Sequence, residues 1–316
     1  MGGSRVGPDT GAARRIVSLL PSATEIVCAL GLADRLVGVS HRCDHPAEVT
    51  RLPRVSHPRC ALDGLSGAEI DAEVRRTLRE HGSVYEVDVE RVAELAPDLV
   101  LTQGICDVCA VPEHEVVAAL GALPAPPAVL TLDAHDIAAI LGGIRAVGRA
   151  TGAPRRADDC VAGIERRTNA VRTRVEGRPR PRVLALEWLD PPYVPGHWVP
   201  ELVALAGGEL AAGVARRPSY QISWDELRGA DPDLLLLMPC GFGLEETRRE
   251  AERYRTVLHD VAGRAIAGGR GYVLEASAYF SRSGPRVVDG LEVLAALTHP
   301  DRFRDVSLSE RAARWY

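Results

Sequence analysis

Short runs of aliphatic residues alternate along this chain with longer segments whose apolar residues recur at helical spacing. The clearest helical repeat joins Ile137, Ile140, Leu141, Ile144 and Val147, which would lie on one face of a helix. Alternation of strands with helices is typical of an α/β fold with mostly parallel sheets. The predicted strands are residues 15–20, 36–40, 98–102, 129–132, 183–187, 234–238 and 272–275.

Two signals indicate where helices of the first half begin. Ser22 and Glu25 are three residues apart after the first predicted strand, which is the spacing of a capping box, so we expect Ser22 to be the N-cap. That helix would run through Leu30 and end at Gly31. A second helix is expected at residues 89–95, directly after a strand-like segment.

The second half of the chain repeats the first. Residues 15–20 (RIVSLL) lead into a Pro-Ser-Ala-Thr-Glu segment, and residues 182–186 (RVLAL) lead through a loop into Pro-Glu-Leu-Val at 200–203. This duplication predicts two similar Rossmann-like lobes, residues 13–153 and 177–316. Residues 154–176 are charged with a sparse apolar stripe, and a helix of that length would span about 30 Å and join the lobes rigidly. A cleft between two lobes is a natural ligand site, which favours binding over catalysis.

Bulk composition narrows the functional classes. The 316 residues are 46% hydrophobic and 26% charged, as in an ordinary globular protein long enough for two domains. A net charge of -5 gives no reason to expect nucleic acid or an anionic membrane as a partner. Seven cysteines, an odd number, do not resemble a disulfide framework. Because no apolar leader, lipidation cysteine or membrane span is visible, we expect a cytoplasmic protein, although a mature form without its leader would look similar.

Candidate ligand contacts follow the predicted strands, because ligands of parallel α/β sheets meet the loops at the carboxyl ends of the strands. Aromatic residues gather in such loops of the second half, which suits a broad, flat, largely apolar ligand. The alternative is that these rings only complete the core of that lobe. The candidate contacts are His41, Arg42, Gln103, Trp188, Tyr193, His197, Trp198, Phe242, Tyr279 and Arg282.

Cysteines in the same loops could hold a metal. Cys106 and Cys109 have the spacing of a metal or redox pair, but the second pair of a closed zinc site is missing. Cys43 (between two histidines) and Cys240 could complete a site for zinc, copper or iron. The alternative is that Cys109 and Cys28 are packed core residues.

Glu187 is a candidate acid/base group. It follows an apolar strand directly, where partial desolvation would raise its pKa. No hydrolase elbow and no Gly-rich phosphate loop is visible. A catalytic role for Glu187 would therefore have to use metal or acid/base chemistry.

With these residues in hand, the chain resembles the periplasmic cobalamin/iron-siderophore binding proteins of ABC importers, most closely their cobalamin-binding branch. The resemblance extends from about Ala13 to Arg304 and is most specific at residues 18–26, 30–31, 37–39, 97–100 and 200–208. It implies two α/β lobes joined by one rigid helix, with the ligand between them. It also implies docking on an ABC permease through Glu25 and Glu201. Each glutamate has a structural alternative, since both stand at predicted helix starts.

Two functions remain open at this point. The first is binding of a corrinoid or another tetrapyrrole-like metal chelate, with His41 or His197 approaching the axial position of the metal. The second is a cytoplasmic metal-dependent enzyme, or an intracellular metal carrier, on the same scaffold. The enzyme would use Cys43, Cys106, Cys240, His197 and Glu187.

Overall fold

Two α/β units make up the part of the chain that the computed structural model describes, residues 12–104, 111 and 113–316. The first unit holds the chain up to Asp63 together with Ala72–Ala134 and Ala138–Gly163. The second unit holds Gly64–Asp71, His135–Ile137 and Ile164–Tyr316. The fold class is therefore α/β with mostly parallel sheets, as predicted.

The first unit is built on a four-stranded parallel sheet in the order β2-β1-β5-β6. All three residues of β1 and all five of β5 are buried, as expected for the central strands of a parallel sheet covered on both faces. A small antiparallel pair, β3 and β4, lies apart from it. The strands are β1 Ile16–Ser18, β2 Leu36–Val39, β3 Ser56–Pro58, β4 Tyr85–Val87, β5 Leu99–Gln103 and β6 Ala128–Leu132.

Helix α3 of the first unit matches its prediction. Asp88 caps α3, because its carboxylate accepts the Arg91 backbone N–H at 2.9 Å, and α3 occupies the predicted residues. The helices that precede residue 154 in the chain are α1 Pro21–Ala29, α2 Gly67–His81, α3 Val89–Leu95, α4 Glu113–Gly121 and α5 Ile137–Ala150. Two short 3-10 turns lie at Ala33–Arg35 and Ala47–Arg51.

The capping box predicted at Ser22 is wrong. Helix α1 begins at Pro21 with Leu20 as its N-cap, and no side chain caps it. Proline is well suited to the first helical position, because the missing N–H would have no partner there and its φ is already helical. Ser22 is therefore displaced into the first turn, where it is buried.

The second unit is built on a five-stranded sheet in the order β10-β7-β12-β13-β14. Its first four strands are parallel, and β14 pairs antiparallel with β13. A smaller antiparallel sheet, β11-β9-β8, follows from the end of β7. The strands are β7 Arg182–Leu186, β8 Trp188–Leu189, β9 Pro192–Val194, β10 Glu209–Leu210, β11 Tyr220–Gln221, β12 Leu234–Leu237, β13 Gly271–Leu274 and β14 Ala312–Arg314.

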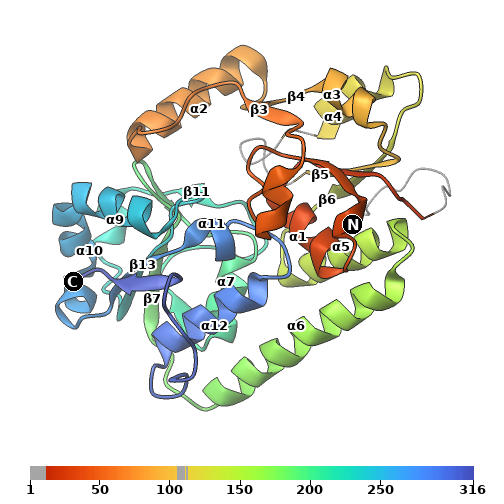
Figure 1. Cartoon of the computed structure of the whole chain (residues 1–316). Coiled ribbons are helices and arrows are strands. Elements are labelled where there is room, and N and C mark those ends of the chain that lie inside the picture. The colour runs from red at the N-terminus through yellow and green to blue at the C-terminus, as the bar shows by residue number, and fades with distance from the viewer. Residues whose placement is uncertain (1–11, 105–110, 112) are drawn as a thin grey trace. The chain divides into compact units, whose positions relative to one another are not determined.

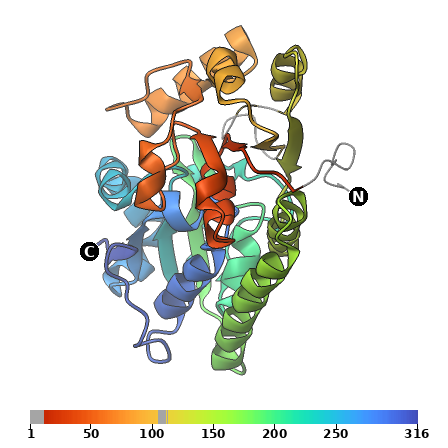
Figure 2. The same cartoon turned by 45° about the vertical axis from the view of Figure 1, so that its right-hand side comes forward.

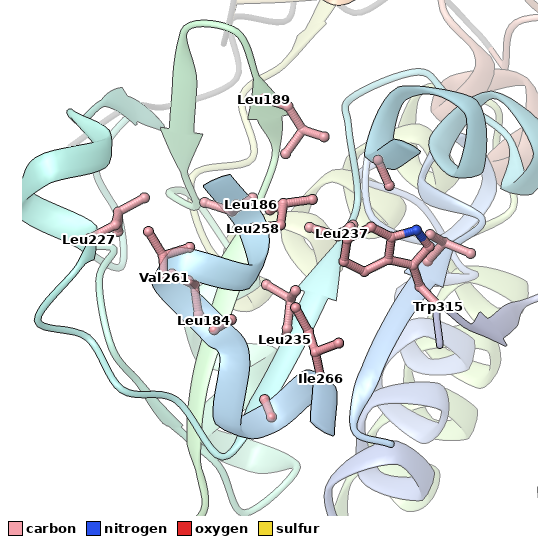
Figure 3. Packing of buried hydrophobic residues seen from close by; sticks show 14 of the residues in the cluster. Leu184, Leu186, Leu189, Leu227, Leu235, Leu237, Leu258, Val261, Ile266 and Trp315 are labelled. Atoms are coloured by element: carbon pink, nitrogen blue, oxygen red, sulfur yellow. The ribbon is translucent and has the colours of Figure 1, made fainter. Parts of the chain in front are cut away.

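Alternate residues of these strands form the core of the second unit. Leu184 and Leu186 of β7 lie with Leu235 and Leu237 of β12 on one sheet face (Figure 3), because side chains two residues apart point the same way. Helix α10 covers that face, and Figure 1 shows α9 and α10 beside β13. The helices are α7 Val199–Leu205, α8 Trp224–Leu227, α9 Leu244–Arg253, α10 Arg255–Ala267, α11 Ala276–Tyr279 and α12 Val287–Thr298.

The predicted connecting helix is α6, Pro154–Val175, which continues without a break for 22 residues (Figure 2). The boundary between the units falls inside it, after Gly163. In its second half, Arg167 forms ion pairs with Asp289 at 2.5 Å and with Glu292 at 2.7 Å, both on α12. Across the described residues, no helix combines the length and the apolar character that crossing a bilayer requires.

Candidate functional site

Aromatic side chains gather at the carboxyl edge of the second unit's sheet. Trp188 follows β7 and Phe242 follows β12, and because the two strands are parallel neighbours, their following residues meet at one edge. The ring centroids are 5.1 Å apart and the rings meet edge to face at 64°, a favourable arrangement for two aromatic rings. Both residues are only half-buried. The two rings therefore lie together at this edge, and their contact with a ligand stays a prediction.

The orientation of Trp188 is fixed by hydrogen bonds. Its indole Nε1 donates to the backbone oxygen of Asp190 at 3.1 Å and to that of Gly67 at 3.2 Å. The Asp190 carboxylate in turn accepts the Tyr254 hydroxyl at 2.8 Å. Trp188 therefore has its polar end bound to the protein.

Glu187 lies directly beside these rings. The Ser219 hydroxyl donates to its carboxyl group at 2.5 Å, and the backbone N–H of Cys240 donates to its main-chain oxygen at 3.0 Å. Burial raises the pKa of Glu187 to about 8, although the Ser219 hydrogen bond acts in the opposite direction. The carboxyl group is thus mostly protonated at neutral pH, the direction that its position after an apolar strand predicted. Its catalytic role stays a prediction.

Tyr279 and Arg282 follow β13 at the same edge. The Tyr279 ring lies 5.5 Å from the guanidinium carbons of both Arg286 and Arg311, close enough for cation–π attraction. Arg282 is buried, and its guanidinium lies 3.4 Å from the Ser277 hydroxyl. This part of the edge combines one aromatic ring with several positive charges.

Three further predicted ligand contacts lie between β9 and α7. Tyr193 is half-buried on β9, and its main-chain oxygen accepts the Glu187 N–H at 2.9 Å. His197 has a φ of 50° and stacks on His135 at 5.6 Å between ring centroids. Trp198 is 6% exposed, so its ring is packed inside and not presented as an open face.

The carboxyl edge of the first unit is polar and hydrogen-bonded to itself. The Thr24 hydroxyl donates to the Ser18 hydroxyl at 2.9 Å and lies 3.1 Å from the Cys43 Sγ. All three side chains are buried. Cys43 is therefore packed as a small core residue with a hydroxyl neighbour, in the manner of a buried, inert thiol.

The other predicted contacts of the first unit have mixed surroundings. His41 is half-buried, with its Nδ1 3.1 Å from the Ser56 hydroxyl and its ring 5.1 Å from that of Tyr85. Burial and the nearby positive charge of Arg42 lower the pKa of His41 to about 4. Arg42 is exposed and Gln103 is buried. Their contact with a ligand remains a prediction.

A metal centre has limited support. Among the residues that the structure describes, no group of three or more His, Cys, Asp or Glu side chains could hold a metal ion. Cys240 is exposed in the second unit and Cys43 is buried in the first. Burial raises the pKa of Cys28 to about 11, which disfavours its thiolate. Cys106 and Cys109 lie outside the described residues.

The two predicted docking glutamates differ in exposure. Glu25 is 4% exposed, so its carboxylate is not displayed on the surface as a docking contact would be. Glu201 is partly exposed and already engaged, because it accepts the Ile137 N–H at 3.0 Å and pairs with Arg216 at 3.2 Å. Docking through these residues stays a prediction.

Sequence reasoning missed the residues that hold the aromatic edge in place. Ser219, Gly67 and Glu250 touch Glu187, Trp188 or each other, yet each is distant from its partner along the chain. The only local signal was at Gly67, which stands after a serine at a helix start. Nothing in the pattern linked that glycine to a tryptophan 121 residues away.

The two α/β units with mostly parallel sheets have the class III architecture seen in solved periplasmic binding proteins. The chain belongs to the periplasmic binding protein family, whose model matches residues 16–267. That membership does not support the predicted cytoplasmic location.

Sequence similarity to individual proteins is consistent with membership of this family. The chain is 25% identical over 304 residues to an uncharacterized ABC transporter substrate-binding lipoprotein, YvrC, of Bacillus subtilis, with 92% of this chain and 82% of the relative covered. It is 26% identical over 231 residues to a vitamin B12-binding protein of Yersinia pestis, with 72% and 70% covered. Among solved structures, a periplasmic heme-binding protein from Pseudomonas aeruginosa matches with a TM-score of 0.70 at 23% identity, covering 92% and 94%.

Proposed function

We propose that this protein binds a flat metal chelate, in the first place a corrinoid, and presents it to an ABC permease. The observation that carries the proposal is the pair of half-buried rings, Trp188 and Phe242, at the carboxyl edge of the second unit's sheet. Aromatic faces at such an edge suit a large planar ligand with substantial apolar surface. A relative that binds vitamin B12 supports the corrinoid as the first choice.

Haem is the second candidate, and one observation favours it. Tyr279 lies near the guanidinium groups of Arg286 and Arg311, and Arg282 follows in the same loop. Guanidinium groups recognise carboxylates well, and haem carries two carboxylates at its edge. One of the solved structures with a similar fold is that of a heme-binding protein. A corrinoid whose side chains are amides would use these arginines less.

A titration distinguishes these ligands. Purified protein is mixed with cyanocobalamin, cobinamide or haemin, and both the absorption spectrum and the heat of mixing are recorded. We expect saturable binding with a micromolar or smaller Kd for at least one of them, tightest for a corrinoid. No saturable response to any of the three would overturn the proposal, and a preference for haemin would replace the corrinoid by haem.

Two single variants show whether binding uses the proposed edge. Trp188→Ala removes a ring of the edge, and we expect it to weaken binding of the best ligand about tenfold. Tyr316→Ala is the matched control, because Tyr316 is an aromatic residue that is 50% exposed at the chain terminus. It should leave the Kd unchanged. If Trp188→Ala and Tyr316→Ala changed the Kd equally, the ligand would have to bind elsewhere on the protein.

A further inference from the structure

One residue, Gly67, connects a buried carboxylate to the tryptophan of the candidate site. The Gly67 backbone N–H donates to Glu250 Oε1 at 2.9 Å, and its backbone oxygen accepts the Trp188 Nε1 at 3.2 Å. All three residues belong to the second unit. The chain segment at Gly67 is therefore bound on one side by Glu250 and on the other by Trp188.

A side chain at residue 67 would displace the Glu250 carboxylate. A Cβ atom added there would overlap the Glu250 carboxylate and lie 3.6 Å from Cε2 of Trp188. The backbone can approach both groups closely only because the residue is glycine. Contact of this kind fixes the distance between Glu250 and the indole ring.

Glu250 is an unusual partner for a backbone N–H, because it is 4% exposed on α9. Burial raises its pKa, while the hydrogen bond from Gly67 and the charge of Arg253, 3.7 Å away, lower it. Burying a carboxyl group costs free energy unless its hydrogen bonds are satisfied. The Gly67 N–H supplies one such bond at the start of helix α2, where backbone N–H groups lack helical partners.

The capping box of α2 does not use the Gly67 N–H. The Glu69 carboxylate accepts both the backbone N–H and the hydroxyl of Ser66, at 2.8 and 2.7 Å, and the Ser66 hydroxyl accepts the Glu69 N–H at 3.3 Å. This is a complete reciprocal capping box. Glu250 is an additional acceptor at this helix start. It differs from Glu69 because its partner, Gly67, also accepts a hydrogen bond from Trp188.

We infer that Glu250 is a positioning residue of the ligand site, which acts through Gly67 to hold the Trp188 ring in the orientation that faces the ligand. The inference rests on the proposed function, since Trp188 is assigned there to ligand contact. An indole held by two backbone oxygens and a fixed neighbour is pre-organised, so less conformational entropy is lost when a ligand binds.

The test compares Glu250→Ala, which removes the acceptor, with Glu250→Gln, which keeps a side-chain oxygen in its place. The Trp188 contribution to the near-ultraviolet circular dichroism of the ligand-free protein is obtained by subtracting the spectrum of the matching Trp188→Phe variant. We expect Glu250→Ala to lose at least half of that signal and Glu250→Gln to retain most of it. Glu245→Ala, an exposed position on the same helix, is the control and should retain all of it.

Gly67→Ala gives a second, independent way to disturb the contact, and it decides the matter where Glu250→Ala fails to fold. It should reduce the Trp188 signal as Glu250→Ala does. For the ligand that binds the unaltered protein best, both variants should weaken binding about five- to tenfold, the effect of roughly one hydrogen bond. Glu250→Gln should restore binding to within about twofold.

Three results would overturn the inference. The Trp188 signal could survive both Glu250→Ala and Gly67→Ala, or Glu250→Gln could lose it as fully as Glu250→Ala does. A lost signal with unchanged ligand affinity would equally refute a positioning role. Because the circular dichroism is measured without ligand, a failure to bind corrinoids or haemin would refute the proposed function and leave this measurement interpretable.

Discussion

The two parallel sheets begin with matching strands but continue differently at their carboxyl ends. In the first unit, β1 passes into α1 through only Leu19 and Leu20. In the second unit, residues 187–198 separate β7 from α7 and form the hairpin of β8 and β9. The short connection lies beside a buried hydroxyl network, and the long one carries two rings, Trp188 and Tyr193, that are only half-buried.

This difference shows where the chemistry of a duplicated fold resides. The strands supply equivalent cores in both units, since β1 and most of β7 are buried. The proposed recognition groups come from the connecting loops, which is usual because loops tolerate insertion while strands must keep their packing. The ligand chemistry of this protein is therefore expected to depend more on residues 187–198 than on the equivalent turn after β1.

The largest expected effect tests that dependence directly. Trp188→Ala combined with Phe242→Ala should weaken ligand binding about 30- to 100-fold, because two aromatic faces and their mutual contact are lost. His41→Ala combined with Gln103→Ala alters the carboxyl edge of the first unit and should weaken it less than about fivefold. Calorimetric titration of both double variants measures the difference. If both double variants lost the same affinity, the two edges would contribute equally to ligand binding.

A second, smaller effect concerns stability instead of binding. Thr24→Val keeps the shape of the side chain but removes the hydroxyl between Ser18 and Cys43. We expect a loss of about 1–3 kcal/mol in the free energy of unfolding, because buried polar groups lose a partner. Urea unfolding followed by circular dichroism measures it.

Thr173→Val is the control for that substitution, because Thr173 is exposed on α6. It should change the free energy of unfolding by less than about 0.5 kcal/mol. Ligand affinity should be nearly unchanged by Thr24→Val. Similar unfolding curves for the two variants would show that the hydroxyl network contributes nothing to the first unit.

Local sequence predicted the elements well and their long-range contacts poorly. The seven strands predicted from short apolar runs are β1, β2, β5, β6, β7, β12 and β13, and α3 occupies the residues predicted for it. The short strands β3, β8, β9, β10, β11 and β14 were not predicted. The start of α1 was misplaced because Pro21 competes with Ser22 for the helix terminus, and both are good local signals. The 15-residue helix α2 was not predicted, since most of its residues are polar or charged.

Side-chain chemistry could be predicted only where it depends on neighbours in sequence. The raised pKa of Glu187 follows from its place after a buried strand, and the structure agrees. The partner that modifies it, Ser219, comes from a loop 32 residues further on. The burial of Glu25 depends on packing that no local pattern reveals.

The last expected effects are opposite pH dependences of stability at the two edges. His41 has its pKa lowered from 6.5 to about 4 in the folded protein. Between these values the unfolded chain binds the additional proton, so stability rises with pH and is complete above 6.5. Glu187 has its pKa raised from 4.5 to about 8. There the folded protein binds the additional proton, so the contribution of Glu187 is complete below 4.5 and is lost as pH rises to 8.

Neutral substitutions separate these two contributions. Between about pH 5 and 6.5 the two contributions oppose each other, so His41→Gln should leave stability declining with pH there. Glu187→Gln should flatten the decline between about pH 6.5 and 8, where His41 no longer titrates. Thermal unfolding midpoints across the pH range measure both slopes. His45→Gln and Glu245→Gln, at exposed positions, serve as controls and should leave each slope as it is. A decline that persists unchanged in Glu187→Gln would show that Glu187 does not cause it and that other buried carboxyl groups, such as that of Glu250, do. There would then be no reason to treat Glu187 as a neutral acid beside the aromatic edge.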